Sequence, residues 1–206
     1  MWFWMHTRWL RCAVFRRARR IEQLRAGANL PATVRFNHLN LGREAKRALL
    51  GWTRFDFLEA GTNGLLECRD DDLRRLAGAA LGHELLDRGH GMIHSSAVEL
   101  GERLHELSEQ GRLGEELRLL DRHDLVLLSD IDALEAGRVE TEMILRLLEH
   151  RRGGRSTIAT SRLLEEPPSR AKDGGSPIDA FRDAPHIRLS DTIQTSFRHR
   201  IQSERH

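Results

Sequence analysis

The sequence of 206 residues contains only two cysteines, and neither has a neighbour at a spacing typical of metal sites. Cys12 and Cys68 lie far apart in a chain rich in leucine and arginine, so we expect reduced thiols rather than a disulfide framework. The eleven histidines form no His-Glu-x₂-His motif, and the Gly-x-Ser-x-Gly turn of serine hydrolases is missing. The sequence therefore predicts neither a metal centre nor a serine hydrolase.

Long apolar runs are also missing. No segment approaches the roughly 18 apolar residues that a membrane-spanning helix needs. The apolar run near the N-terminus is only about five residues long, and arginines follow it, which is the reverse of the charge order in a signal peptide. We therefore expect a cytoplasmic protein without membrane contacts.

Lysine is nearly absent, because only Lys46 and Lys172 accompany the arginines among the 33 basic residues. The net charge of +2 does not by itself predict a polyanion-binding protein. Residues 8–25 nevertheless predict a basic helix whose cationic cluster comprises Arg16, Arg17, Arg19 and Arg20. This cluster is either a solvated helix face or an arm that contacts DNA phosphates, which requires clustered arginine or lysine.

The content of 39% apolar and 31% charged residues is typical of a soluble globular protein, and the length suits one α/β domain with an appendage. Apolar runs predict strands at residues 64–67, 91–96, 124–130, 156–161 and 185–190. Helices are predicted between them, notably at residues 70–88 and 140–153. Strands that alternate with helices indicate a parallel sheet covered on both faces.

Several segments occur in an order and spacing that resemble one family of ATPases. They are FLEAGTNGLLE, LAGAALGHELLDRGH, the run from Ala97 to Leu134, and RRGGRSTIATS. Over residues 19–196 the chain resembles the IstB/DnaC-type AAA+ ATPases, which are transposition helpers and helicase loaders.

The resemblance implies a P-loop NTPase-like (AAA+) α/β domain of three layers at residues 36–190. A basic helical arm at residues 1–35 would precede this domain, and a basic tail at residues 191–206 would follow it. The resemblance also implies ATP and Mg²⁺ as cofactors. The implied partners are DNA, a transposase or replicative helicase, and further copies of the chain in an AAA+-type homo-oligomer.

The phosphate-binding loop of the family has the form Gly-x-x-Gly-x-Gly-Lys-Thr, and this chain departs from it. Aligned without gaps, Cys68, Asp71 and Leu73 replace the three glycines, Arg74 replaces the lysine and Arg75 the threonine. Glycines allow the backbone to turn its N–H groups towards phosphate, and the replacing side chains disfavour those conformations. Arg74 keeps a positive charge without the compact ammonium of lysine, whereas Arg75 offers no hydroxyl to Mg²⁺.

The predicted helix after this loop begins among Asp70, Asp71 and Asp72. The N-terminus of a helix favours anions, so these carboxylates would cap the helix and repel phosphate. The segment thus keeps the strand and helix that flank a phosphate loop and loses the loop's binding groups.

Further departures fall at other positions that the resemblance marks as functional. Ser129 and Asp130 stand where the family has two adjacent acids, so the metal-side acid is replaced and the catalytic-side acid is kept. Arg162 stands in the sensor strand where the family has asparagine, and Ala180 follows Asp179 where the family has arginine. By itself, an aspartate such as Asp130 is more often a helix or turn cap than a catalytic acid.

Four hypotheses follow from these residues. The first, which we favour, is an accessory protein of the IstB/DnaC type with impaired ATP binding and no hydrolysis. The second is a working ATPase in which Arg74 holds the phosphates and Asp130 positions Mg²⁺ or water. The third is a non-enzymatic DNA-binding or adaptor module that uses residues 8–25, and the fourth is the product of a decayed mobile-element gene.

Overall fold

The computed structural model describes residues 19, 21–30, 34–162, 177–181 and 184–189. Residues 19 and 21–27 are helical, so the helix predicted at residues 8–25 is confirmed at residues 19 and 21–25, and Arg19 is exposed. Arg16, Arg17, Arg20 and the tail at residues 191–206 lie outside the described residues.

In the described part of the chain, five strands form one parallel sheet in the order β2-β3-β4-β1-β5. The strands are β1 (Asn63–Cys68), β2 (Met92–Ser96), β3 (Leu125–Ser129), β4 (Ser156–Ser161) and β5 (His186–Leu189). All five coincide with predicted strands to within two residues at each end. Their parallel pairing places every carboxyl end at one edge of the sheet.

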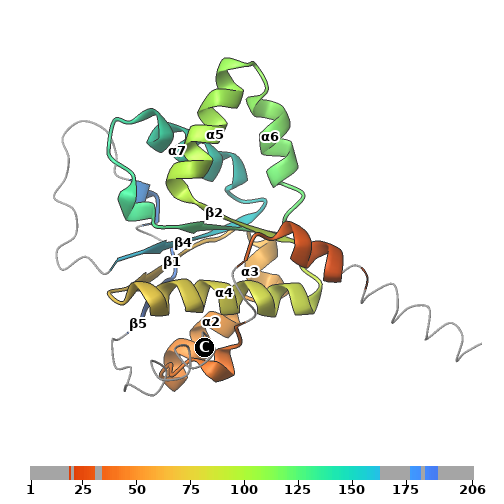
Figure 1. The fold of residues 1–206 in the computed structure, drawn as a ribbon, viewed down its shortest axis with the longest axis vertical. Helices are drawn as coiled ribbons and strands as arrows, with labels where there is room; N and C mark the ends of the chain where they lie inside the picture. The colour runs from red at the N-terminus through yellow and green to blue at the C-terminus, as the bar shows by residue number, and fades with distance from the viewer. Residues whose placement is uncertain (1–18, 20, 31–33, 163–176, 182–183, 190–206) are drawn as a thin grey trace, which may run out of the picture.

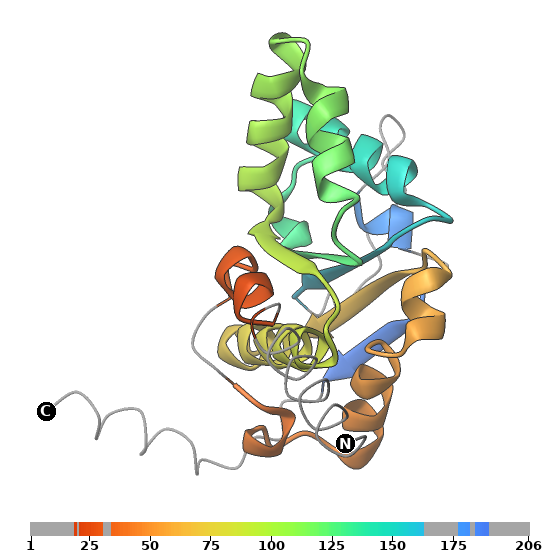
Figure 2. The same cartoon turned by 90° about the vertical axis from the view of Figure 1, so that its right-hand side faces the viewer.

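Helices cover both faces of this sheet, as the sequence predicts (Figure 1). The α-helices are α2 (Arg43–Gly51), α3 (Phe55–Glu59), α4 (Asp71–Arg88), α5 (Ala97–Glu109), α6 (Leu113–Leu120) and α7 (Val139–Arg151). Short 3₁₀ helices are η1 (Phe36–His38), η2 (Ile131–Ala133) and η3 (Pro177–Phe181). Figure 2 shows the same sheet with the pair α5–α6 projecting from the face opposite α4. None of the helices in the described ranges is long and apolar enough to cross a bilayer.

Two hydrophobic cores form because strand residues alternate between the two faces of the sheet. On β3, Leu125 and Leu127 pack towards α4, whereas Val126 and Leu128 pack towards α5 and α7. All four side chains are buried. The middle strands are therefore apolar on both faces, and polar side chains remain mainly at the strand ends.

The boundaries of α4 follow from its terminal residues. The Asp70 carboxylate accepts a hydrogen bond from Leu73 N at 2.9 Å, which caps the first turn as expected from the sequence. Gly89 ends the helix in the left-handed conformation with φ of 87°, which glycine adopts without strain. Asp70 and Gly89 thus fix an 18-residue helix that spans the sheet from its carboxyl edge to its amino edge.

Residues 21–30 pack on the sheet rather than extending away from it. Ala28 is fully buried, and its carbonyl accepts a hydrogen bond from His94 N at 3.1 Å. Arg25 and Arg35 both form ion pairs with Asp87 near the end of α4. This part of the N-terminal region therefore belongs to the core of the domain.

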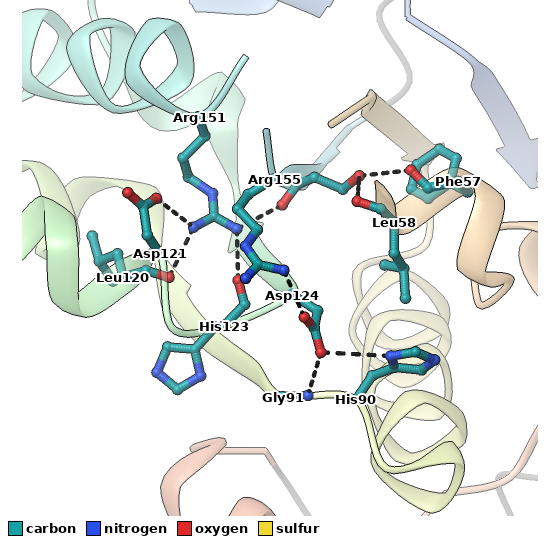
Figure 3. A network of polar contacts seen from close by, with 11 residues as sticks. Phe57, Leu58, His90, Gly91, Leu120, Asp121, His123, Asp124, Arg151 and Arg155 are labelled. Atoms are coloured by element: carbon teal, nitrogen blue, oxygen red, sulfur yellow. Dashed lines mark hydrogen bonds and ion pairs between the residues drawn. The ribbon is translucent and has the colours of Figure 1, made fainter. Parts of the chain in front are cut away.

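Arg151 organises the amino edge of the sheet (Figure 3). Its side chain is 0% exposed, and its guanidinium donates to the carbonyls of Leu120, His123 and Ser156 at 2.8, 3.1 and 3.0 Å. Asp121 lies 3.4 Å from the same group. Burial lowers the pKa of Arg151 to about 10. One buried cation therefore joins the loop before β3 to the start of β4.

A second group of contacts extends this edge towards the end of α4. Asp124 accepts hydrogen bonds from Arg155 at 2.8 Å and from Gly91 N at 3.0 Å. The same carboxylate lies 3.5 Å from Nδ1 of His90. The position of His90 is thus tied to the loops at the amino ends of the strands.

Candidate functional site

The carboxyl edge of the sheet holds the residues that the sequence predicts for a nucleotide site. β1 ends at Cys68 and α4 begins at Asp71, so only two residues separate strand and helix. The positions aligned with the end of the phosphate loop, from Asp71 to Arg75, are helical. The flanking strand and helix are present, but the structure has no extended loop between them.

Arg74 occupies the centre of this region. Its side chain is 7% exposed and forms a 2.6 Å ion pair with Asp130, at the end of β3. It also lies 2.9 Å from an Asp71 carboxylate oxygen and donates to the Cys68 carbonyl at 3.3 Å. One guanidinium thus joins the ends of β1 and β3 to the first turn of α4.

Asp130 has an unusual backbone conformation. It follows β3 with φ of 57°, in the left-handed region that aspartate tolerates better than most side chains. Its N–H donates to the Thr160 hydroxyl of β4 at 3.3 Å, and its side chain is 49% exposed. The turn directs the carboxylate towards Arg74 while leaving half of it accessible to solvent.

The remaining predicted site residues lie around this ion pair. Arg162 lies 3.5 Å from the Asp71 carboxylate, and its backbone N–H donates to Asp132 at 3.2 Å. The Ser129 hydroxyl donates to the Ser95 carbonyl at 3.5 Å. The structure therefore brings Arg162 and Ser129 to the same edge as Arg74.

Arg75 takes no part in the ion pair between Arg74 and Asp130. Its side chain is 67% exposed and forms a 2.7 Å ion pair with Asp72, which is 79% exposed. An exposed pair of this kind contributes little to stability. Of the two arginines at the loop positions, only Arg74 is held inside the structure.

A cavity of about 250 Å³ adjoins the ion pair. Gly78 and Ala79 of α4 line it on one side, and Leu127 and His94 of the sheet line it on the other. Its polar lining includes Asp71, Asp72, Arg74, Arg75, Ser129, Asp130, Thr160 and Arg162. The predicted nucleotide-site residues, apart from the buried Cys68, thus share one cavity.

The residues present do not fit Mg²⁺-ATP bound in the manner that the family motif implies. Backbone N–H groups that would receive phosphate are already used, since those of Leu73 and Arg74 donate to Asp70. Asp130, the acid that is kept at the catalytic-side position, is neutralised by Arg74. A triphosphate would also meet the carboxylates of the first turn of α4, which carry the same charge sign.

Sequence reasoning missed Thr160 and the Cys68 carbonyl as parts of this site. Thr160 lies two residues after Ile158 on β4, so strand alternation places both side chains on the α4 face. That signal is visible in the sequence. The carbonyl of Cys68 has no sequence signature, because every residue carries one.

Comparisons with known proteins agree with this architecture. The profile of the family described as "IstB-like ATP binding protein" matches residues 10–169, which is well over half of the chain. No curated protein matches the chain.

Three similar solved structures share the fold at low sequence identity. A DNA replication initiation factor has a TM-score of 0.64 at 18% identity; the match covers 85% of this chain and 55% of that one, about half its length. The DnaC helicase loader has a TM-score of 0.56 at 16% identity, with 71% of this chain and 89% of that chain covered. DnaI has a TM-score of 0.56 at 14% identity, with 79% and 93% covered. The sheet order and covering helices are those of a P-loop AAA+ domain, and the chain belongs to the family of IstB-like ATP-binding proteins.

Proposed function

We propose that this protein is an accessory factor of the IstB/DnaC type in DNA transposition or helicase loading, and that it does not hydrolyse ATP. The carrying observation is the ion pair of Arg74 with Asp130 at 2.6 Å. In the alignment with the family motif, Arg74 takes the place of the phosphate-binding lysine and Asp130 that of the catalytic-side acid. In this chain the charges of Arg74 and Asp130 are paired with each other.

Several contacts favour the ion pair over a bound nucleotide. Arg74 is buried, and it has a second carboxylate, that of Asp71, at 2.9 Å. Displacing these carboxylates would leave acidic groups beside incoming phosphates, which is electrostatically unfavourable. ATP binding is therefore weak, and the accessory role depends on protein and DNA contacts rather than on turnover.

Calorimetric titration of the full-length protein with ATP, with and without Mg²⁺, tests this function together with a turnover assay. We expect no turnover above a buffer blank and no binding in the micromolar range. Turnover at ordinary AAA+ rates that disappears in Asp130→Ala would contradict the proposal. Micromolar binding that disappears in Arg74→Ala would favour the working-ATPase alternative.

DNA is the proposed polyanionic partner. The replication initiator DnaA, solved with AMPPCP and single-stranded DNA, has a similar fold with a TM-score of 0.63 at 16% identity. In this chain the arginines at positions 16, 17, 19 and 20 would supply sequence-independent phosphate contacts. Duplex binding should therefore weaken between low and moderate salt, and affinity that is unchanged by salt would contradict this assignment.

A further inference from the structure

An open groove lies at the amino edge of the domain, away from the Arg74 cavity. It has a volume of about 630 Å³ and is bounded by α2, the turn after it and the end of α4. Ala48, Leu50 and Gly51 contribute apolar surface. The remaining lining residues are Glu44, Arg47, Arg54 and Arg88. Three arginines around apolar surface, with one acid among the lining residues, give the groove a basic rim.

These arginines can exchange their present partners for another anion. Arg54 lies 3.3 Å from Asp56, with both side chains about 70% exposed, and Arg88 lies 3.0 Å from Glu84. Exposed pairs of this kind contribute little to stability, so a phosphate can replace the carboxylate at little cost. Arg47 is exposed, and within the part of the chain that the structure describes its guanidinium forms no ion pair.

An exposed aromatic side chain follows one of the groove arginines in the sequence. Phe55 directly follows Arg54 and is 62% exposed, the largest value among the exposed large hydrophobics of the described chain. Its ring is stacked with the ring of His90: the two ring centroids are 6.4 Å apart, and the ring planes are inclined by 30°. His90 is itself placed by Asp124 (Figure 3). The ring therefore has a supported face and a face open to solvent.

We infer that this groove binds a single-stranded nucleic acid, with a base stacked on Phe55 and phosphates at Arg47, Arg54 and Arg88. Base stacking on aromatic rings combined with a cationic path for the backbone is the general chemistry of single-strand binding. A duplex keeps its bases stacked internally, so it could use the arginines and not the ring. An acidic peptide could also use the arginines, but it would not require an open aromatic face.

This assignment does not rest on the proposed function. α4 has 18 residues, and a helix of that length extends about 27 Å, so its Arg88 end lies far from Arg74. The arginines at positions 16–20 form a separate basic segment. A result at the groove therefore says nothing for or against ATP binding.

Fluorescence anisotropy of a labelled twelve-nucleotide oligo-dT with the full-length protein tests the inference. We expect Phe55→Ala to weaken single-strand binding at least fivefold, based on the roughly 1–3 kcal/mol that aromatic stacking contributes per base. Arg47→Glu should also weaken it. This variant should reduce the slope of log affinity against log salt by about 0.7 for each phosphate that the protein no longer neutralises.

Matched variants on α6 provide the control. Leu119→Ala removes a side chain that is 43% exposed, and Arg118→Glu reverses an exposed charge; both should bind oligo-dT like the wild type. Replacing the arginines at positions 16, 17, 19 and 20 should weaken duplex and single-strand binding alike, whereas Phe55→Ala should affect only single strands. Wild-type affinity in both Phe55→Ala and Arg47→Glu would overturn the inference. So would an effect of Phe55→Ala that is equal for duplex and single strand, or an acidic peptide that binds independently of Phe55.

Discussion

Two arginines are buried at opposite edges of the same sheet, and their partners differ. Arg151 at the amino edge bonds to three backbone carbonyls and lies near one carboxylate. Arg74 at the carboxyl edge bonds to one carbonyl and two carboxylates, and a cavity adjoins it. Backbone carbonyls are fixed by the fold, whereas half-exposed carboxylates can turn to water. Two arginines that are similarly buried therefore differ in how far their partners can rearrange.

The difference also separates the contacts that hold the sheet together from those that line the cavity. The loops at the amino edge are held by Arg151 and by Asp124, which do not depend on the Arg74 cavity. The side chains at the carboxyl edge can therefore differ from those of the family motif without loss of the layered fold. In this chain an internal ion pair lies where the family motif would bind phosphate.

The largest expected effect is at Arg151. Arg151→Met would remove the side-chain donor that three backbone carbonyls share, while the Leu120 carbonyl keeps its bond from His123 N at 3.1 Å. Removing one member of a buried polar network costs about 3–5 kcal/mol. Urea unfolding followed by tryptophan fluorescence, to which the buried Trp52 contributes, would measure the free energy of unfolding. If Arg151→Met lowers the free energy of unfolding by less than about 1 kcal/mol, water replaces the guanidinium. Arg151 would then not differ from Arg74 in the way that the comparison requires.

A smaller effect is expected at Arg74. In Arg74→Met the carboxylates of Asp71 and Asp130, which are 59% and 49% exposed, can be hydrated, so we expect a decrease in unfolding free energy of about 1–2 kcal/mol. Arg75→Met is the matched control, because its exposed pair with Asp72 should contribute less than about 0.5 kcal/mol. If Arg74→Met is as costly as Arg151→Met in the same unfolding assay, Arg74 is a structural clamp and not the remnant of a ligand site.

Much of the fold is predictable from the sequence because it depends on local patterns. The apolar runs of β3 and β4 and the caps at Asp70 and Gly89 place the central elements within two residues. Two parallel strands joined through a helix then imply the layered arrangement. The amphipathic pattern is enough to predict the layers, because alternate residues of each strand form the core on each face of the sheet.

The site is only partly predictable, because its key contacts are long-range. Asp130 and Arg74 are 56 residues apart, and no spacing rule indicates that they meet at 2.6 Å. The partners of Arg151 are carbonyls, which are present at every residue, so the sequence marks it only as one basic residue before a glycine stop. The family motif marks the positions of the site, while the geometry determines that Arg74 and Asp130 satisfy each other.

The smallest expected effect is a pH dependence confined to the amino edge. The pKa of His123 is lowered from 6.5, first by burial and then by the charge of Arg151, while Asp124 opposes the shift. The folded protein thus binds the His123 proton less readily than the unfolded chain does. The stability from neutral His123 is fully present above pH 6.5 and is lost as pH falls through that value towards the lowered folded pKa.

His123→Gln isolates this contribution, because glutamine does not titrate. Between about pH 8 and pH 5 we expect the unfolding free energy of the wild type to fall more steeply than that of His123→Gln, with the difference developing below pH 6.5. The Arg74 edge provides the contrast, since Arg74→Met should shift the unfolding free energy without removing the His123 contribution to the pH slope. If the unfolding free energy of wild type and of His123→Gln changes with pH at the same slope, protonation of His123 near Arg151 costs no stability. The amino edge would then tolerate a change of charge as well as the carboxyl edge does. The fixed carbonyl partners of Arg151 would not explain a difference between Arg151 and Arg74.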